Sequence, residues 1–140
     1  MPFREKIAWV SLAGIVAAFT PYFVLVGHYS GPASAYAGFS VGLLIGMVVV
    51  LTILVTVASI GVALTNIRDA QAPADERDHT VARRASSIAY AVLLPALFFA
   101  MATVLLGWSA IGVINAVLAA VVLAELARNA LEIVCYRRGW

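Results

Sequence analysis

Charged residues divide this chain into alternating polar and apolar segments. No Lys, Arg, Asp or Glu occurs between residues 7 and 67, and none occurs between residues 85 and 124. The charges gather in a short N-terminal segment, in a central segment over residues 68–84 and near the C-terminus. An apolar run of about 20 residues crosses the roughly 30 Å hydrocarbon core of a bilayer as one helix. The pattern therefore predicts membrane-spanning helices on both sides of a polar linker.

Turn-forming residues subdivide the two apolar segments. Gly31-Pro32 interrupts the first, and Gly107-Trp108-Ser109 leaves room only for a tight turn in the second. The chain is therefore predicted to be all-α: an integral membrane protein with four transmembrane helices in an antiparallel bundle, forming a single domain. The expected helices cover residues 7–27, 38–67, 86–106 and 110–135, and residues 68–84 form the linker.

Composition and charge distribution place the chain in a bilayer and orient it there. Its hydrophobic fraction of 64% and charged fraction of 11% differ from the roughly 45–50% and 25% of soluble proteins. A soluble fold of this size has no way to bury so much apolar surface, so lipid is the expected surroundings. All nine Lys and Arg residues lie in the three polar segments. The positive-inside rule then places both termini and the linker in the cytoplasm.

The second half of the linker has the pattern of a helix that continues into the third apolar segment. Asp75 is a suitable N-cap, and Glu76 and Asp78 follow where the helix dipole favours negative charge. One interpretation is a solvated helix anchored at anionic headgroups by Arg83 and Arg84. Another is a docking surface for a cytoplasmic protein, because acidic residues contribute little to membrane orientation. The candidate docking residues are Asp75, Glu76, Arg77, Asp78, Arg83 and Arg84. Val81, Ala85, Ile88 and Ala89 share a separate apolar face at helical spacing.

The same segment resembles that of a known group of proteins. Asp75-Glu76-Arg77-Asp78, followed by Arg84-Ala85 and Ile88-Ala89-Tyr90, is similar to the pattern of small bacterial four-helix membrane proteins grouped as a domain of unknown function. The C-terminal Tyr136-Arg137-Arg138-Gly139 and the charged N-terminal segment add to the resemblance. Such proteins are often encoded beside small helix-turn-helix or LytTR-type transcription regulators. The resemblance therefore implies a multi-pass protein of the bacterial inner membrane with a regulatory partner, and it supplies no catalytic residues.

Small and polar residues inside the apolar segments indicate helix packing. Gly38, Gly42 and Gly46 lie on one helix face and would let another helix approach closely. We expect this face to pack the second helix on the first or fourth, with homodimerisation as the alternative. Asn115 is an amide side chain well inside the predicted fourth helix, and we expect it to form a hydrogen bond between helices.

The fourth helix carries charge where it approaches the cytoplasm. Glu125 would lie near the inner edge of the hydrocarbon, where a carboxylate is costly and often functional. However, Arg128 and Glu132 follow at helical spacing and would form an interfacial cluster of ion pairs with it. We therefore expect a salt-bridged amphipathic helix end rather than a proton pathway.

Other kinds of site find no support in the sequence. His28 and His79 are expected on opposite sides of the membrane, so they do not form a shared metal or haem site, and Cys135 is the single cysteine. No catalytic residue, cofactor or direct nucleic-acid contact is expected. The predicted function is a non-enzymatic regulatory or scaffolding partner acting through its cytoplasmic face. The alternative is a small oligomeric transporter or channel subunit, which would need a polar cavity within the membrane.

Overall fold

The computed structural model describes residues 3–29, 33–65, 67 and 76–138 of the chain. These residues form four helices, α1 (Phe3–Gly27), α2 (Ala33–Thr65), α4 (Glu76–Ala102) and α5 (Ala110–Arg138). Each of the four is long and apolar enough to span a membrane. The prediction of an all-α chain with four such helices is confirmed.

Two helices begin before the membrane spans predicted for them. α4 begins at Glu76, before the predicted span at residue 86, because the second half of the linker is helical and joins the apolar run without a break, as the sequence predicted. α2 begins at Ala33 rather than at residue 38. The proposed N-cap, Asp75, lies outside the described residues. The charged first turns of α4 and its apolar turns therefore belong to one continuous helix.

The connection between α4 and α5 is longer than the expected three-residue turn. α4 ends at Ala102, and residues 103–107 form a turn in which the Thr103 hydroxyl donates to the Ala100 carbonyl oxygen at 2.6 Å. Gly107 ends this turn with a φ of 75°. An L side chain at that φ would bring its Cβ close to the backbone, so glycine is the residue that suits this position.

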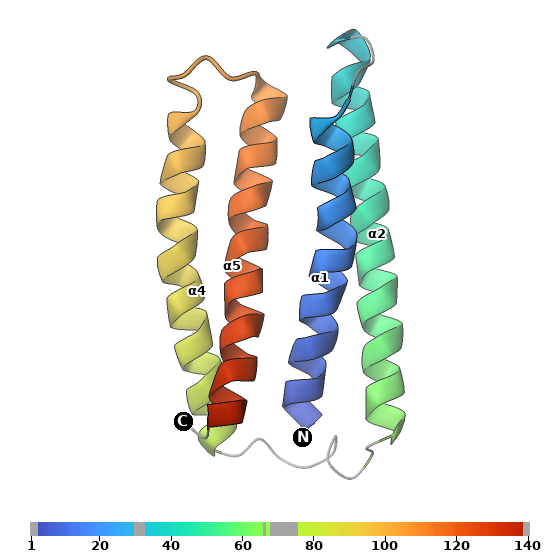
Figure 1. Cartoon of the computed structure of the whole chain (residues 1–140), viewed down its shortest axis with the longest axis vertical. Coiled ribbons are helices and arrows are strands. Elements are labelled where there is room, and N and C mark those ends of the chain that lie inside the picture. Colours follow the sequence, from blue (N-terminus) through green and yellow to red (C-terminus); the bar gives the residue numbers. More distant parts are fainter. Residues whose placement is uncertain (1–2, 30–32, 66, 68–75, 139–140) are drawn as a thin grey trace.

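The helices lie side by side in the order α4, α5, α1, α2 (Figure 1). α5 packs against both α4 and α1, and α1 packs against α2. Each neighbouring pair is antiparallel, and both chain termini lie at the same end of the molecule, here called the terminal end (Figure 1). The first and last helices of the chain therefore occupy the centre of the arrangement, whereas α2 and α4 form its two edges.

Small side chains form the contact between α4 and α5. Val81, Ala85 and Ala89, spaced four residues apart on α4, are buried. Small residues with this spacing let two helix backbones approach closely, which is how helices associate in lipid. Ile88 was expected on the same face, but it is 47% exposed, because it lies about 100° around the helix from its neighbour Ala89. It faces outwards beside the buried row.

A second contact, centred on α1, holds the two helical hairpins together. Phe19, Tyr22 and Val26 of α1 are buried together with Val122 of α5. The rings of Phe19 and Tyr22 meet edge to face, with centroids 6.4 Å apart and planes at 77°. This geometry is one that aromatic pairs prefer. Tyr22, the largest fully buried side chain among the described residues, therefore lies at the junction of the two halves.

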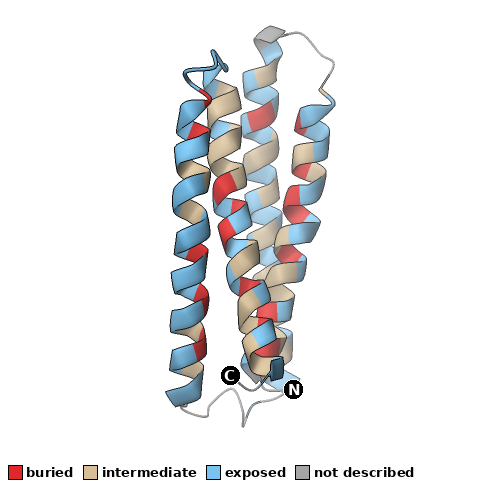
Figure 2. Cartoon of the chain, turned by 60° about the vertical axis from the view of Figure 1, so that its left-hand side comes forward, coloured by how far each residue is buried: buried red, intermediate tan, exposed pale blue. Residues whose placement is uncertain are grey.

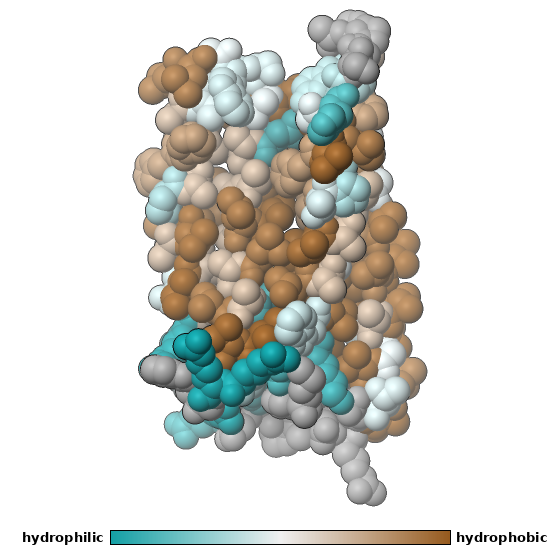
Figure 3. Space-filling model, viewed as in Figure 1, coloured by the Kyte–Doolittle hydropathy of each residue, from teal (hydrophilic) through white to brown (hydrophobic). Residues whose placement is uncertain are grey.

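Most large apolar side chains remain exposed (Figure 2). None of the most apolar stretch of α2 is buried, and Ile45 and Val57 in it are 60% and 64% exposed. Figure 3 shows hydrophobic residues along the middle of the molecule and hydrophilic ones gathered at the terminal end. Water would make so much exposed apolar surface unfavourable. The surface is the kind that suits a lipid environment.

The expectation for the glycine run of α2 has to be corrected. A Cβ added at Gly38, Gly42 or Gly46 would have no other atom of the described chain within 4 Å, so this face does not pack on α1, α4 or α5. The close approach of α1 and α2 lies instead at Gly14, where an added Cβ would meet Val55 Cγ2 at 2.8 Å. Glycines four residues apart give a helix a flat face on which another helix could pack, but they do not determine which helix packs there.

Candidate functional site

A network of charged side chains joins three helices at the terminal end. Arg4 Nε of α1 lies 2.9 Å from Asp78 Oδ2 of α4. The Tyr136 hydroxyl of α5 donates to the other carboxylate oxygen of Asp78, also at 2.9 Å. Arg77 in turn donates to the Tyr136 carbonyl oxygen at 3.4 Å. Asp78 is thus the acceptor on which groups from α1 and α5 converge.

A second ion pair lies beside the first. Glu5, which is 3% exposed, accepts a hydrogen bond from Arg137 Nε at 3.2 Å. The Arg137 guanidinium also lies 5.5 Å from the ring centroid of Trp9, within the range of a cation–π contact. A buried carboxylate without a cation would be strongly destabilising, so removal of Arg137 alone would destabilise this helix end. We call Arg4, Glu5, Asp78, Tyr136 and Arg137 the terminal clasp.

The clasp accounts for part of the charge that the sequence suggested for docking a partner. Asp78 was assigned to the docking surface, but its side chain is only 19% exposed and it pairs within the chain. Glu76, Arg77, Arg83 and Arg84 are exposed on α4, whereas Asp75 lies outside the described residues. The exposed docking candidates are therefore fewer than expected, and all belong to the first turns of one helix.

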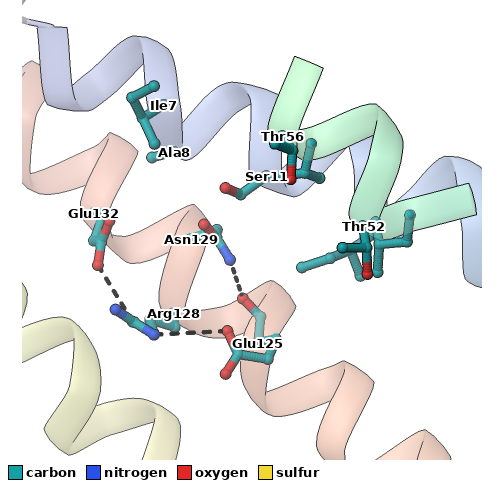
Figure 4. Close-up of a pocket in the computed structure, with 12 residues that line it drawn as sticks. Ile7, Ala8, Ser11, Thr52, Thr56, Glu125, Arg128, Asn129 and Glu132 are labelled. Atoms are coloured by element: carbon teal, nitrogen blue, oxygen red, sulfur yellow. Dashed lines mark hydrogen bonds and ion pairs between the residues drawn. The ribbon is translucent and has the colours of Figure 1, made fainter. Parts of the chain in front are cut away.

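A polar cleft of about 440 Å³ lies between α1, α2 and α5 (Figure 4). Its charged wall comes from α5, and hydroxyl groups of Ser11 on α1 and of Thr52 and Thr56 on α2 complete it. The polar residues that define this cleft are Ser11, Thr52, Thr56, Glu125, Arg128, Asn129 and Glu132. The three hydroxyl residues come from segments that are otherwise apolar, and no pattern in the sequence indicates that they would face the α5 charges.

The predicted charge cluster of α5 forms one wall of this cleft. Arg128 Nη1 lies 3.8 Å from Glu125 Oε2, and Arg128 Nε lies 3.4 Å from Glu132 Oε1. Asn129 donates from its side chain to the Glu125 carbonyl oxygen at 2.8 Å. Exposed pairs at these spacings contribute about 0.2–0.5 kcal/mol each to helix stability. The Glu125 side chain is about half exposed. It lines the cleft and is also paired with Arg128.

A closed ring of hydrogen bonds links three helices near the other end of the molecule. The Tyr22 hydroxyl donates to Asn115 Oδ1 at 2.6 Å, and Asn115 Nδ2 donates to Ser40 Oγ at 3.5 Å. Ser40 Oγ lies 3.2 Å from the Tyr22 oxygen, so its own proton completes the ring. Each of the three side chains thus donates one hydrogen bond within the ring. The ring gives Asn115 the bond between helices expected of it, and the partners come from α1 and α2.

The two histidines lie far from one another. His28 is exposed just after α1, and its Nδ1 lies 2.9 Å from the Val24 carbonyl oxygen. His79 is exposed near the start of α4, at the terminal end. Within the described ranges, no group of three or more His, Cys, Asp or Glu residues has a geometry suited to a metal ion.

Comparison of the chain with protein-family models, with curated proteins and with solved structures gives no match. The resemblance of the segment around Glu76 to small bacterial membrane proteins thus stays a prediction. Three features of the structure bear on function: the exposed charges of α4 beside the terminal clasp, the polar cleft, and the ring at Tyr22. The three side chains of the ring bond to one another, whereas the other two features are open to a ligand or a partner.

Proposed function

We propose that this protein is a multi-pass protein of the bacterial inner membrane and acts as a non-enzymatic regulatory or scaffolding partner. Its cytoplasmic face would bind a soluble protein, such as a transcription regulator, through the first turns of α4. The one-sided distribution of charge supports this orientation, because positively charged segments are retained in the cytoplasm.

The observation that carries the proposal is that only some of the charged residues at the terminal end belong to the terminal clasp. Arg4, Glu5, Asp78 and Arg137 pair with one another. The clasp does not include Glu76, Arg83 or Arg84, which are exposed. Helix ends anchored in a membrane need basic residues, whereas an acidic residue among them repels anionic headgroups. An exposed mixed-charge face is more useful for recognising a protein of complementary charge.

A charge exchange on α4 tests the docking surface. The double variant Glu76→Lys with Arg83→Glu keeps the net charge and the number of basic residues, so membrane orientation is preserved. We expect tagged wild-type protein, isolated from native membranes at moderate salt, to capture a soluble partner that the double variant loses. Asp78→Asn is the matched control, because it removes an acidic charge that belongs to the clasp and not to the exposed surface.

The two variants should separate binding from stability. Asp78→Asn is expected to keep the partner and to lower the unfolding temperature, whereas the charge exchange should lose the partner and unfold like the wild type. The same set of captured proteins for wild type and charge exchange would contradict the docking function. Loss of the partner in Asp78→Asn alone would assign binding to the clasp region instead of the exposed turns.

The polar cleft favours a second candidate, a small oligomeric transporter or channel subunit. A transporter needs polar groups that converge on a cavity between helices, and Glu125, Ser11 and Thr52 line such a cleft. Reconstituted into vesicles, the wild type should then conduct or exchange a small charged solute, and Glu125→Gln should reduce that flux. Equal flux in protein-free vesicles would remove this candidate and leave the docking function unaffected.

A further inference from the structure

A narrow crevice separates α4 from α5 close to the terminal end. Its volume is about 170 Å³, and Arg84 and Arg138 both line it, one from each helix. Between them lie the side chains of Ala85, Ile88, Leu131, Val134 and Cys135. The crevice therefore combines two guanidinium groups with an apolar wall.

The two arginines differ from those of the terminal clasp and the polar cleft. Arg4, Arg128 and Arg137 each lie within 4.0 Å of a carboxylate. In the described portion of the chain, neither Arg84 nor Arg138 has an acidic partner within that distance. Two cations of like charge on facing helices repel each other unless an anion lies between them. The site is electrostatically complementary to a group with at least one negative charge.

The wall of the crevice indicates the other half of the occupant. Ile88 and Val134 are 47% and 42% exposed, so the apolar surface is open to the outside of the molecule. Arg84 is the last charged residue before the long apolar stretch of α4, and Arg138 ends α5. Both guanidinium groups thus lie where a bilayer would change from headgroups to acyl chains. An amphipathic anion fits this arrangement better than a small soluble one.

The geometry points to a binding site for one anionic phospholipid, whose phosphate lies between Arg84 and Arg138 and whose acyl chain lies against Ile88 and Val134. Basic pockets between transmembrane helices on the cytoplasmic side are suited to such headgroups. The carbonyl groups at the end of α5 carry partial negative charge, which Arg137 and Arg138 offset. The bound lipid contacts both α4 and α5, so it stabilises these two helices against separation.

The test uses the purified full-length chain in detergent micelles and native mass spectrometry. Titration with phosphatidylglycerol should give one retained lipid per chain, whereas phosphatidylcholine with the same acyl chains should be retained much less. Arg84→Gln with Arg138→Gln should weaken phosphatidylglycerol binding by about 30-fold, because each basic contact contributes about a factor of five. The matched control is Arg83→Gln, which removes an exposed charge from outside the crevice and should bind as the wild type does.

Two further measurements define the site. Val134→Trp fills the crevice while keeping both arginines, and it should also lose the lipid. Inorganic phosphate at millimolar concentration should not displace phosphatidylglycerol, because it lacks the acyl chain. The proposal would be overturned if the two lipids were retained equally or if phosphate displaced phosphatidylglycerol. It would also be overturned if Arg83→Gln lost as much binding as the double variant, or if the crevice variants bound the lipid as the wild type does. Circular dichroism of every variant shows that it is folded, and the single variant Arg84→Gln replaces the double one if that fails to fold. No partner protein is present, so the outcome is independent of the docking function.

Discussion

Arg4 and Asp78 form an ion pair of 2.9 Å between α1 and α4, two helices that each pack on α5. The pair closes the terminal end across α5, with Tyr136 contributing a second hydrogen bond to the same carboxylate. Contacts between distant parts of a chain hold helix ends in register that would otherwise fray. The charged N-terminal segment is thus a structural element of the fold.

Asp78→Asn should lower the stability of the folded chain by about 1 kcal/mol, since a partly exposed ion pair with one additional hydrogen bond contributes about that much. The measurement is the unfolding temperature in detergent micelles. His79→Gln, on an exposed neighbouring residue, should have no effect. Arg4→Gln combined with Asp78→Asn should destabilise by less than the sum of the single changes; additive effects would mean that the two groups do not interact.

Gly14→Leu and Gly42→Leu form a matched pair of variants. Gly14→Leu forces a side chain against Val55 and should destabilise the chain by about 1–3 kcal/mol, as overpacking does. A Cβ added at Gly42 meets nothing within 4 Å, so a side chain there has open space and we expect the unfolding temperature of the monomer not to change. If Gly42→Leu lowers it at high protein concentration only, the glycine run of α2 is a homodimer contact. Equal effects at all concentrations would contradict the helix arrangement described here.

Tyr22→Phe should cost about 0.6 kcal/mol and at most about 1.7 kcal/mol, the average and the maximum measured for hydrogen bonds between membrane helices. The change leaves Asn115 and Ser40 without their shared partner, whereas Tyr90→Phe, at an exposed position, should be neutral. Adding Asn115→Leu to Tyr22→Phe should cost little more, because the buried amide that had lost its partner is then removed as well. Unfolding temperatures of the four proteins test this, and a cost for Tyr90→Phe equal to that of Tyr22→Phe would argue against the ring.

Cysteine labelling in intact cells tests the proposed orientation. In a Cys135→Ser background, Trp108→Cys places a thiol at the turn after α4, and His79→Cys places one at the terminal end. A membrane-impermeant maleimide should label the cysteine at position 108 and leave the one at position 79 unlabelled until the cells are broken. The reverse pattern would place both termini outside the cytoplasm and remove the basis of the docking function.

The sequence predicted the helices well, because charge-free runs and turn residues are local signals. It also predicted that α4 would continue from its charged turns, since the acidic residues after Asp75 mark a helix start. The pairing of Asp78 with Arg4 was missed because ion pairs between distant segments leave no local pattern. For the same reason Ser11, Thr52 and Thr56 gave no sign that they would meet Glu125. The glycine run of α2 makes no close contact within the described chain, so its homodimer alternative stays a prediction, whereas the isolated Gly14 makes the close contact.

The order α4, α5, α1, α2 has a consequence for how the chain can be divided. Two hairpins, α1 with α2 and α4 with α5, meet through the α1–α5 contact and the terminal clasp, which are made by residues of the helices themselves. We expect these contacts to align the two halves without a covalent link between them. Residues 1–65 and 76–140, expressed together as separate polypeptides, should reassemble into the same four-helix structure, which makes the protein a natural starting point for a split reporter of helix association.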